Sequence, residues 1–258
     1  MPPAMESCVL LAWGHAELGT FAEGRPLGEE GLRLAEVVDQ PASLIRAYHG
    51  LGLLALYQGD LRRAFSWLER AMGICQDAGL PTWFPRIAAA LGAAYTLGGR
   101  IADVVPLLTQ AMEQATATES VYQTQCHLAL GEAQLLAGRM EEAHTLAKRT
   151  LVLARERQER GHEAYALRLL SDIAARREPL ESDQAGEYYC QALALAEESG
   201  MRPLHAHCHL GLGTLYIKTG RQERAHTALS TAMEMYRAMA MAFWLPQTEA
   251  ALAQVEGC

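Results

Sequence analysis

The chain has 258 residues, of which 50% are hydrophobic but only 7% aromatic, and its formal net charge is −8. This balance is typical of closely packed helices rich in Ala and Leu. The negative charge argues against nucleic acid as a partner, because nucleic acid requires a basic surface. No apolar run approaches the ~20 residues of a membrane span, and no basic lead precedes the apolar run 8–13, so neither a membrane helix nor a signal peptide is expected.

One pattern of Leu, Gly, Gly and Ala recurs along the chain. Its clearest copy is Leu51, Gly52, Gly59 and Ala64. Successive turn glycines lie 39 or 40 residues apart over the first four copies, and a fixed period of this size indicates a stacked array of repeated units. The other copies are Leu91, Gly92 and Gly99 with Val104; Leu130, Gly131, Gly138 and Ala143; Leu212, Gly213, Gly220 and Ala225; and a degenerate first copy, Leu11, Ala12, Gly19 and Gly24.

Each unit is predicted to be a pair of helices. The first helix carries the Leu-Gly pair, and the turn glycine seven residues later ends it in the left-handed conformation. The second helix then carries Ala, a large apolar residue and Ala at spacings of four and three, as in Ala64, Leu68 and Ala71. This spacing keeps the three side chains on one face, where small residues allow the first helix to pack closely.

The pattern predicts six units in chain order. Their expected ranges are 4–39, 42–79, 81–119, 121–160, 162–200 and 202–239. Proline marks three junctions, at Pro41, Pro81 and Pro203, where a first turn tolerates it. The fifth unit departs from the pattern, because Ser171 replaces the glycine and the turn at 176–183 is longer by two residues.

The last segment is predicted to be a single helix at 243–256 that caps the array. The run Trp244-Leu245-Pro246 repeats the run Trp83-Phe84-Pro85 that opens the third unit. Polar residues then recur along the segment, as expected for a terminal helix with one face in water. These polar residues are Gln247, Glu249, Gln254 and Glu256.

The metal-capable side chains do not form a predicted metal site. His205 and His209 are one helical turn apart, so zinc is one interpretation of the cluster that they form with His207 and Cys208. The favoured interpretation is packing, because His209 and Cys208 occupy the repeat positions of His127 and Cys126. The six cysteines show no CxxC pair or disulfide spacing, and we expect reduced thiols in a cytoplasmic protein without cofactor or metal.

No catalytic or nucleotide-binding motif is complete in this sequence. His162-Glu163 begins a zincin-like pattern, but Ala166 replaces the second histidine. Gly211 and Gly213 lie inside a predicted helix and follow no strand. They therefore do not form the glycine-rich turn of a dinucleotide-binding site. The sequence has no phosphate-binding GxxxxGK loop and no GxSxG elbow. We therefore expect a protein that is not an enzyme.

The repeated residues resemble the tetratricopeptide repeat family over essentially the whole chain. The resemblance implies an all-α fold, a right-handed superhelical solenoid of six helix pairs plus a C-terminal capping helix, as a single domain over 1–258. The units exceed the usual 34 residues of this family. The longer variety is similar to the C-terminal arms of bacterial STAND-type regulators and of cyclase or ATPase signalling proteins, and the chain would then be a fragment or a truncated homologue.

The resemblance also implies a binding surface. Ligands of the family contact the first helix of each unit, six and three positions before the Leu-Gly glycine and one after it. Arg46 and Arg86 are equivalent in adjacent units, which suits an acidic peptide or a phosphate-bearing ligand; alternatively they are solvated and pair with residues such as Asp60 or Asp77. The polar residues at these positions are Arg46, His49, Arg86, Gln125, Glu132, Tyr165, Arg168, Asp172, His207 and Thr214.

The predicted function is a non-catalytic scaffold of a bacterial signalling protein that binds a protein or peptide on its concave surface. The chain contains no asparagine, so the asparagine clamp with which chaperone-adaptor members of the family hold a C-terminal carboxylate cannot form. The alternative is a small-molecule sensor arm, to which Trp13, Tyr57, Tyr165 and Asp172 would contribute. The sequence leaves self-association into a homo-oligomer open.

Overall fold

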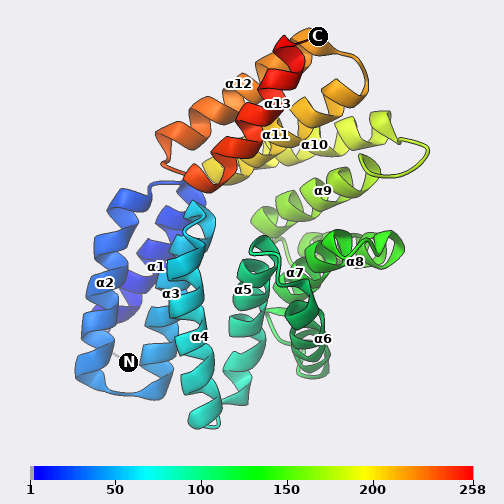
Figure 1. Cartoon of the computed structure of the whole chain (residues 1–258). Helices are drawn as coiled ribbons and strands as arrows, with labels where there is room; N and C mark the ends of the chain where they lie inside the picture. Colours follow the sequence, from blue (N-terminus) through cyan, green and yellow to red (C-terminus); the bar gives the residue numbers. More distant parts are fainter. Residues whose placement is uncertain (1–2, 258) are drawn as a thin grey trace. The chain divides into compact units, whose positions relative to one another are not determined.

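The computed structural model describes residues 3–257, and within that range it contains thirteen α-helices, two short 3-10 helices and no strand (Figure 1). The predicted all-α fold of six helix pairs and a final single helix is confirmed. The α-helices are α1 (Pro3–Leu18), α2 (Phe21–Val38), α3 (Pro41–Gln58), α4 (Leu61–Asp77), α5 (Phe84–Leu97), α6 (Ile101–Ala117), α7 (Gln123–Leu136), α8 (Met140–Glu156), α9 (Arg160–Ala174), α10 (Ser182–Glu198), α11 (Arg202–Lys218), α12 (Gln222–Ala238) and α13 (Leu245–Glu256), and the 3-10 helices are η1 (Pro81–Trp83) and η2 (Ala242–Trp244).

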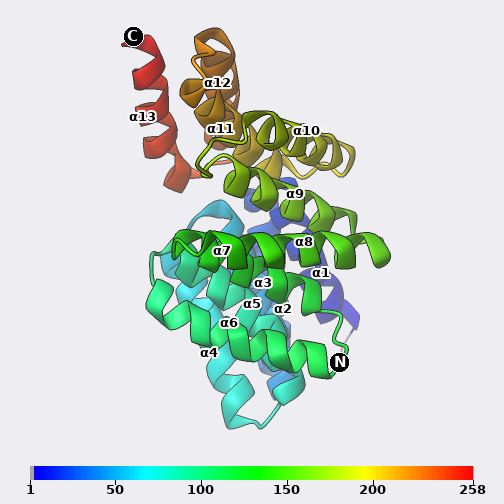
Figure 2. The same cartoon turned by 90° about the vertical axis from the view of Figure 1, so that its right-hand side faces the viewer.

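The chain divides into two compact units between Ala137 and Gly138. In the first unit α1 packs on α2 and α3, α3 on α4 and α5, and α5 on α6 and α7. In the second unit α9 packs on α8, α10 and α11, and α11 packs on α12 and α13. Within each unit the odd-numbered helices therefore form one layer and the even-numbered helices lie beside them (Figures 1 and 2).

The predicted turn glycines end the first helix of their pairs. Gly59 has φ 82°, and its backbone N–H reaches the carbonyl of Leu56, which closes α3. Asp60 follows and its carboxylate accepts a hydrogen bond from the Arg63 N–H at 3.2 Å, which caps the start of α4. The other four predicted turn glycines, Gly19, Gly99, Gly138 and Gly220, also have positive φ.

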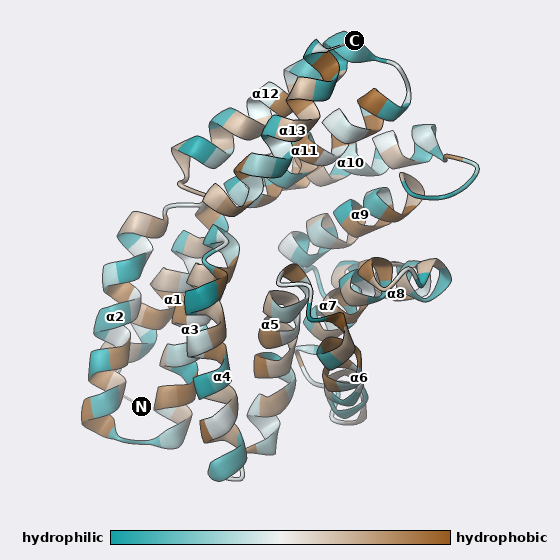
Figure 3. Cartoon of the chain, in the orientation of Figure 1, coloured by the Kyte–Doolittle hydropathy of each residue, from teal (hydrophilic) through white to brown (hydrophobic). Residues whose placement is uncertain are grey.

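The repeated Gly, Leu and Ala positions form the seam between the two helices of a pair. A Cβ on Gly52 would lie 2.5 Å from the side chain of Leu68, so the glycine admits that leucine against the backbone of α3. Ala64, Leu68 and Ala71 on α4 are fully buried. Figure 3 shows hydrophobic and hydrophilic residues alternating along the helices, as expected when each helix buries one face.

The unit junctions follow the predicted proline positions. Pro41 begins α3, Pro203 lies in the first turn of α11, and Pro81 begins η1. The two runs with Trp and Pro adopt the same local structure, a 3-10 turn that leads directly into an α-helix. The final helix, α13, buries Thr248 and Leu252, and the polar residues predicted for its wet face are exposed.

The fifth helix pair differs from the others in its turn. Seven residues, 175–181, connect α9 to α10, whereas two or three residues connect the helices of the other pairs. Of the four residues by which this connection exceeds the usual three, the predicted insertion accounts for two and the early end of α9 at Ala174 accounts for the other two. Pro179 lies within this connection, where no helical hydrogen bond requires its missing N–H.

Candidate functional site

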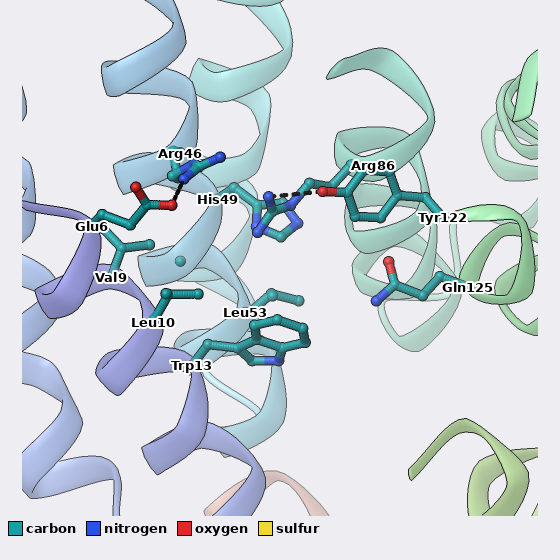
Figure 4. Close-up of a pocket in the computed structure, with 11 residues that line it drawn as sticks. Glu6, Val9, Leu10, Trp13, Arg46, His49, Leu53, Arg86, Tyr122 and Gln125 are labelled. Atoms are coloured by element: carbon teal, nitrogen blue, oxygen red, sulfur yellow. Dashed lines mark hydrogen bonds and ion pairs between the residues drawn. The ribbon is translucent and has the colours of Figure 1, made fainter. Parts of the chain in front are cut away.

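Side chains from α1, α3, α5 and the start of α7 surround a cavity of about 240 Å³ in the first unit (Figure 4). All of these elements belong to the odd-numbered layer of the unit. The lining residues are Glu6, Val9, Leu10, Trp13, Arg46, His49, Gly50, Leu53, Arg86, Tyr122 and Gln125.

Four of the ten polar residues predicted to bind a ligand meet at this cavity: Arg46 and His49 from α3, Arg86 from α5 and Gln125 from α7. Spacings of three and four residues place positions six before, three before and one after the repeat glycine on one helix face. Because successive odd-numbered helices pack side by side, this face is shared by neighbouring repeats, and equivalent residues converge.

Arg86 is buried and held in place by aromatic groups. Only 8% of Arg86 is exposed, and its Nη1 donates a hydrogen bond to Tyr122 Oη at 3.1 Å. Its guanidinium carbon lies 5.3 Å from the centroid of the Tyr122 ring and 5.8 Å from that of Trp83. Contacts of this kind stabilise a cation without neutralising its charge.

Arg46 lies on the other side of the same cavity. Its guanidinium forms an ion pair with Glu6 of α1 and lies 5.3 Å from the centroid of the Trp83 ring. The alternative of arginines that pair with neighbouring carboxylates applies to Arg46, although its partner is Glu6 and not Asp60 or Asp77. Arg86 is buried, Arg46 pairs with Glu6, and Asp60 caps α4 instead.

Two further polar groups of the cavity have a buried atom without a hydrogen-bond partner in residues 3–257. These atoms are His49 Nδ1, in a side chain that is 4% exposed, and the indole Nε1 of Trp13. Burial lowers the pKa of His49 well below its usual value, and the charges of Arg86 and Arg46 lower it further. His49 is therefore neutral at pH 7 and offers one donor and one acceptor nitrogen.

The other predicted polar residues lie away from this cavity. Glu132, on α7, is half-buried and does not line it. Tyr165, Arg168 and Asp172 lie on α9 of the second unit, where Arg168 Nη1 pairs with Asp172 Oδ2 at 2.8 Å. The hydroxyl of the buried Tyr189 donates to the other Asp172 oxygen.

The remaining two residues lie on α11. His207 Nδ1 is 2.7 Å from Tyr236 Oη, and its ring centroid is 4.7 Å from that of Trp244. Thr214 is exposed, and its hydroxyl donates to the Leu210 carbonyl at 2.9 Å. His207 thus contacts Tyr236 and Trp244, partners that the repeat position alone did not indicate.

The histidine and cysteine cluster of α11 has the character of packing. The ring centroids of His205 and His209 are 4.8 Å apart, and no group of three or more metal-capable side chains occurs in the described range. Cys126 and Cys208 are fully buried at equivalent positions, and burial raises the pKa of each thiol to about 12. The described cysteines are free, and Cys258 lies outside the described residues.

Helix α1 contributes lining residues that were not predicted from the sequence. Glu6, Val9 and Trp13 lie six before, three before and one after Ala12, which stands where the other copies have the repeat glycine. The same positional rule would have found all three residues if it had been applied to this degenerate copy. Tyr122 precedes α7, at a position that the rule does not include.

A comparison with protein families identifies the repeat. The profile of the family described as tetratricopeptide repeat matches residues 45–77, which contain α3 from its second turn and all of α4. This segment of the chain is similar to a tetratricopeptide repeat. Among curated protein sequences none matches it. No helix within residues 3–257 of this repeat protein has the length and apolar character needed to cross a membrane.

Solved structures share the fold of this chain at low sequence identity. A Rap protein complexed with Competence and Sporulation Factor is 13% identical, with a TM-score of 0.70 over 97% of this chain and 85% of that chain. NprR in complex with its cognate peptide NprX is 15% identical, with a TM-score of 0.71 over 96% of this chain and 74% of that chain.

A third similar structure is a signal transduction ATPase with numerous domains (STAND) from Pyrococcus horikoshii, which carries a tetratricopeptide repeat sensor. It is 15% identical, with a TM-score of 0.56, and the alignment covers 88% of this chain but 42% of that protein. These likenesses show the fold that the sequence predicted.

Proposed function

We propose that this protein is a non-catalytic scaffold of a bacterial signalling system, and that it binds an acidic peptide segment on the odd-numbered helices of its first unit. The observation that carries the proposal is the convergence of Arg46, His49 and Arg86 on one cavity that apolar side chains such as Leu10 and Leu53 also line. Such a site combines charge with an apolar surface, as ligand sites commonly do.

The local charge favours an acidic ligand. Two guanidinium groups line the cavity and Glu6 is the one carboxylate among the lining residues, although the whole chain carries a net charge of −8. His49 adds no charge at pH 7 because burial keeps it neutral. Charge-assisted hydrogen bonds from arginine to carboxylate are among the stronger polar contacts in proteins.

The similar structures support a peptide as the ligand. NprR is described with its cognate peptide, and a further NprR structure is described as the apo form of a quorum sensor. Because these proteins are less than a fifth identical to this chain, the support lies in the shared fold. The proposal that the peptide is acidic rests on the arginines of the cavity.

The composition of the cavity does not favour catalysis. Its polar groups are two arginines, a neutral histidine, an amide, a phenol, an indole and one carboxylate that is paired with Arg46. The lining residues include no Ser, Thr or Cys nucleophile beside the imidazole, which nucleophilic catalysis would require.

A second candidate function is a small-molecule sensor. The buried indole N–H of Trp13 lacks a partner in the described part of the chain, and the cavity volume of about 240 Å³ suits a compact ligand. A metabolite that raised the melting temperature by acting at this cavity would favour this function over peptide binding.

Selection of heptapeptides from a random display library on the full chain tests the proposal. We expect acidic peptides to be enriched, and the double substitution Arg46→Ala and Arg86→Ala to weaken their binding by about 10-fold or more. The matched control is Arg62→Ala with Arg70→Ala, which removes the same charge from exposed positions of α4.

The two double variants separate a local effect from a general charge effect. Binding is measured by calorimetry, and circular dichroism verifies that both variants remain helical. Failure of the library to yield any peptide would contradict the proposal. Equal affinities of the two double variants would show that the ligand binds elsewhere.

A further inference from the structure

Glu6 occupies a distinctive place in the cavity. It lies in the first turn of α1 and pairs with Arg46 of α3, forty residues further along the chain (Figure 4). The Glu6 side chain is 41% exposed, whereas that of Arg46 is 19% exposed. Glu6 is therefore the more solvent-exposed partner of this ion pair.

The two arginines differ in how their charge is balanced. Arg46 has a carboxylate partner, but the polar and aromatic contacts of Arg86 are to the neutral residues Tyr122 and Trp83. In the described range no carboxylate forms an ion pair with Arg86, although this residue is 8% exposed. A buried cation is costly without a counter-charge, so Arg86 favours the arrival of an anion.

Trp83 and His49 connect the two arginines. Both guanidinium groups lie within 6 Å of the centroid of the same Trp83 ring, at 5.3 and 5.8 Å. His49 lies in the same cavity, with 4% of its surface exposed and its Nδ1 unpartnered within residues 3–257. Two guanidinium groups and one unsatisfied ring nitrogen thus face a space into which one carboxylate already reaches.

We propose that Glu6 is a built-in substitute for a ligand carboxylate, and that an acidic peptide side chain displaces it from Arg46 to lie beside Arg86. The apolar neighbour of that acidic residue then packs on Leu10, Leu53 and Trp13. This inference rests on the proposed peptide-binding function and specifies how the same cavity recognises its ligand. The bound group is a carboxylate rather than a phosphate, because Arg46 already forms an ion pair with a carboxylate.

Displacement of Glu6 from Arg46 should cost the protein little stability. Ion pairs with an exposed partner contribute little to stability, because both groups are well hydrated when apart. Glu6 also lies near the beginning of a helix, so its side chain can turn into solvent without any change in the backbone. Removing its charge should therefore tighten ligand binding by about 2- to 5-fold, the range expected for one exposed ion pair.

The test uses the full chain and three defined peptides. The probe is N-acetyl-Leu-Asp-Leu-amide, and its comparison peptides carry Asn or phosphoserine in place of Asp. Binding to wild type, Glu6→Gln and Arg86→Gln is followed through the tryptophan indole N–H signals in nuclear magnetic resonance titrations. The matched control is Glu29→Gln, which removes one exposed carboxylate from α2.

We expect the Asp peptide to shift the Trp13 indole signal, Glu6→Gln to tighten its binding, and Glu29→Gln to leave it unchanged. The Asn peptide should bind weakly and with equal affinity to wild type and Glu6→Gln. An unchanged or weaker affinity of Glu6→Gln for the Asp peptide would overturn the inference, as would stronger binding of the phosphoserine peptide. If Arg86→Gln still abolishes binding in those cases, the proposed function stands and only the role of Glu6 is wrong.

Discussion

Gly52 lacks a side chain because Leu68 fills the space beside it. A Cβ at Gly52 would lie 2.5 Å from two atoms of Leu68, and Gly92 has the same relation to Leu108. Leu68 is fully buried among the residues of the first core cluster, so it has little room to withdraw. The Leu-Gly pair of the repeat is therefore a packing requirement between the helices of a pair.

The substitution Gly52→Ala should destabilise the protein by about 1–3 kcal/mol, because overpacking a well-filled core forces side chains away from their preferred positions. The matched control is Gly73→Ala in the middle of α4, where an added Cβ meets nothing within 4 Å. That change should stabilise by about 0.5–1 kcal/mol through helix propensity. Urea unfolding measures both, and a stabilised Gly52→Ala protein would contradict the packing argument.

The pH dependence of stability should carry a contribution from His207. Burial, followed by the charge of Arg168, lowers the pKa of His207 to about 3, whereas an unfolded histidine has a pKa of about 6.5. Between these values the unfolded chain binds a proton that the folded chain does not. The contribution of His207 is therefore complete above about pH 6.5 and is lost as the pH falls, by at most about 1.4 kcal/mol per pH unit.

Urea unfolding of wild type and His207→Gln between about pH 7 and pH 4 tests this expectation. The variant should be less stable at pH 7, because the contact with Tyr236 changes, but its stability should fall less steeply on acidification. His209, whose pKa burial and His205 lower to about 4, is present in both proteins, so the difference isolates His207. Parallel slopes would contradict the assignment.

The candidate site could be predicted from the sequence as far as its repeat positions are regular. Arg46, Arg86 and Gln125 stand at the same position of successive repeats, and stacking brings them to one cavity. The partners that give these residues their chemistry follow the pattern only in part. Glu6 stands at the equivalent position of the degenerate first copy, forty residues before Arg46, whereas Trp83 precedes the third repeat's first helix and has no counterpart in the repeat positions.

At the scale of the helices, the repeat pattern predicted most of the fold because its signals are local. A turn glycine in the left-handed conformation ends a helix wherever it lies, and proline can begin one. The loop 175–181 is the main difference, since the sequence located the two extra residues but not the early end of α9. The repeat pattern carried no information about that end.

An aromatic cluster joins the start of the final helix to α11 and α12. Trp244 stacks on Tyr236 with ring centroids 5.8 Å apart, contacts His207 at 4.7 Å and is 7% exposed. The substitution Trp244→Ala should therefore cost on the order of 3 kcal/mol. Hydrogen exchange should show protection lost first in α12 and α13, because a repeat is stabilised by its immediate neighbours.

The exposed Phe243 next to Trp244 gives a matched control for that prediction. Its side chain is 41% exposed, so Phe243→Ala should change stability and exchange much less. Equal effects of the two substitutions, or a loss of protection confined to helices remote from α13, would show that the cluster does not attach the final helix.

At the scale of the whole molecule, the division between Ala137 and Gly138 has no counterpart in the repeat pattern. The pattern Leu130, Gly131, Gly138 and Ala143 runs across this point with its usual spacing. A repeat period reports what each pair of helices looks like. It does not report how tightly successive pairs are joined, and for that reason the repeat pattern does not predict two units.

The long connection between α9 and α10 shows how the array can be altered. After the seven residues 175–181, α10 resumes with Ala185, Tyr189 and Ala192 buried as in the other second helices. Two residues have thus been added without rotating any helix away from its neighbours. The same connection should accept a fluorophore or an affinity tag, which would make it an attachment point for following ligand binding in the intact chain.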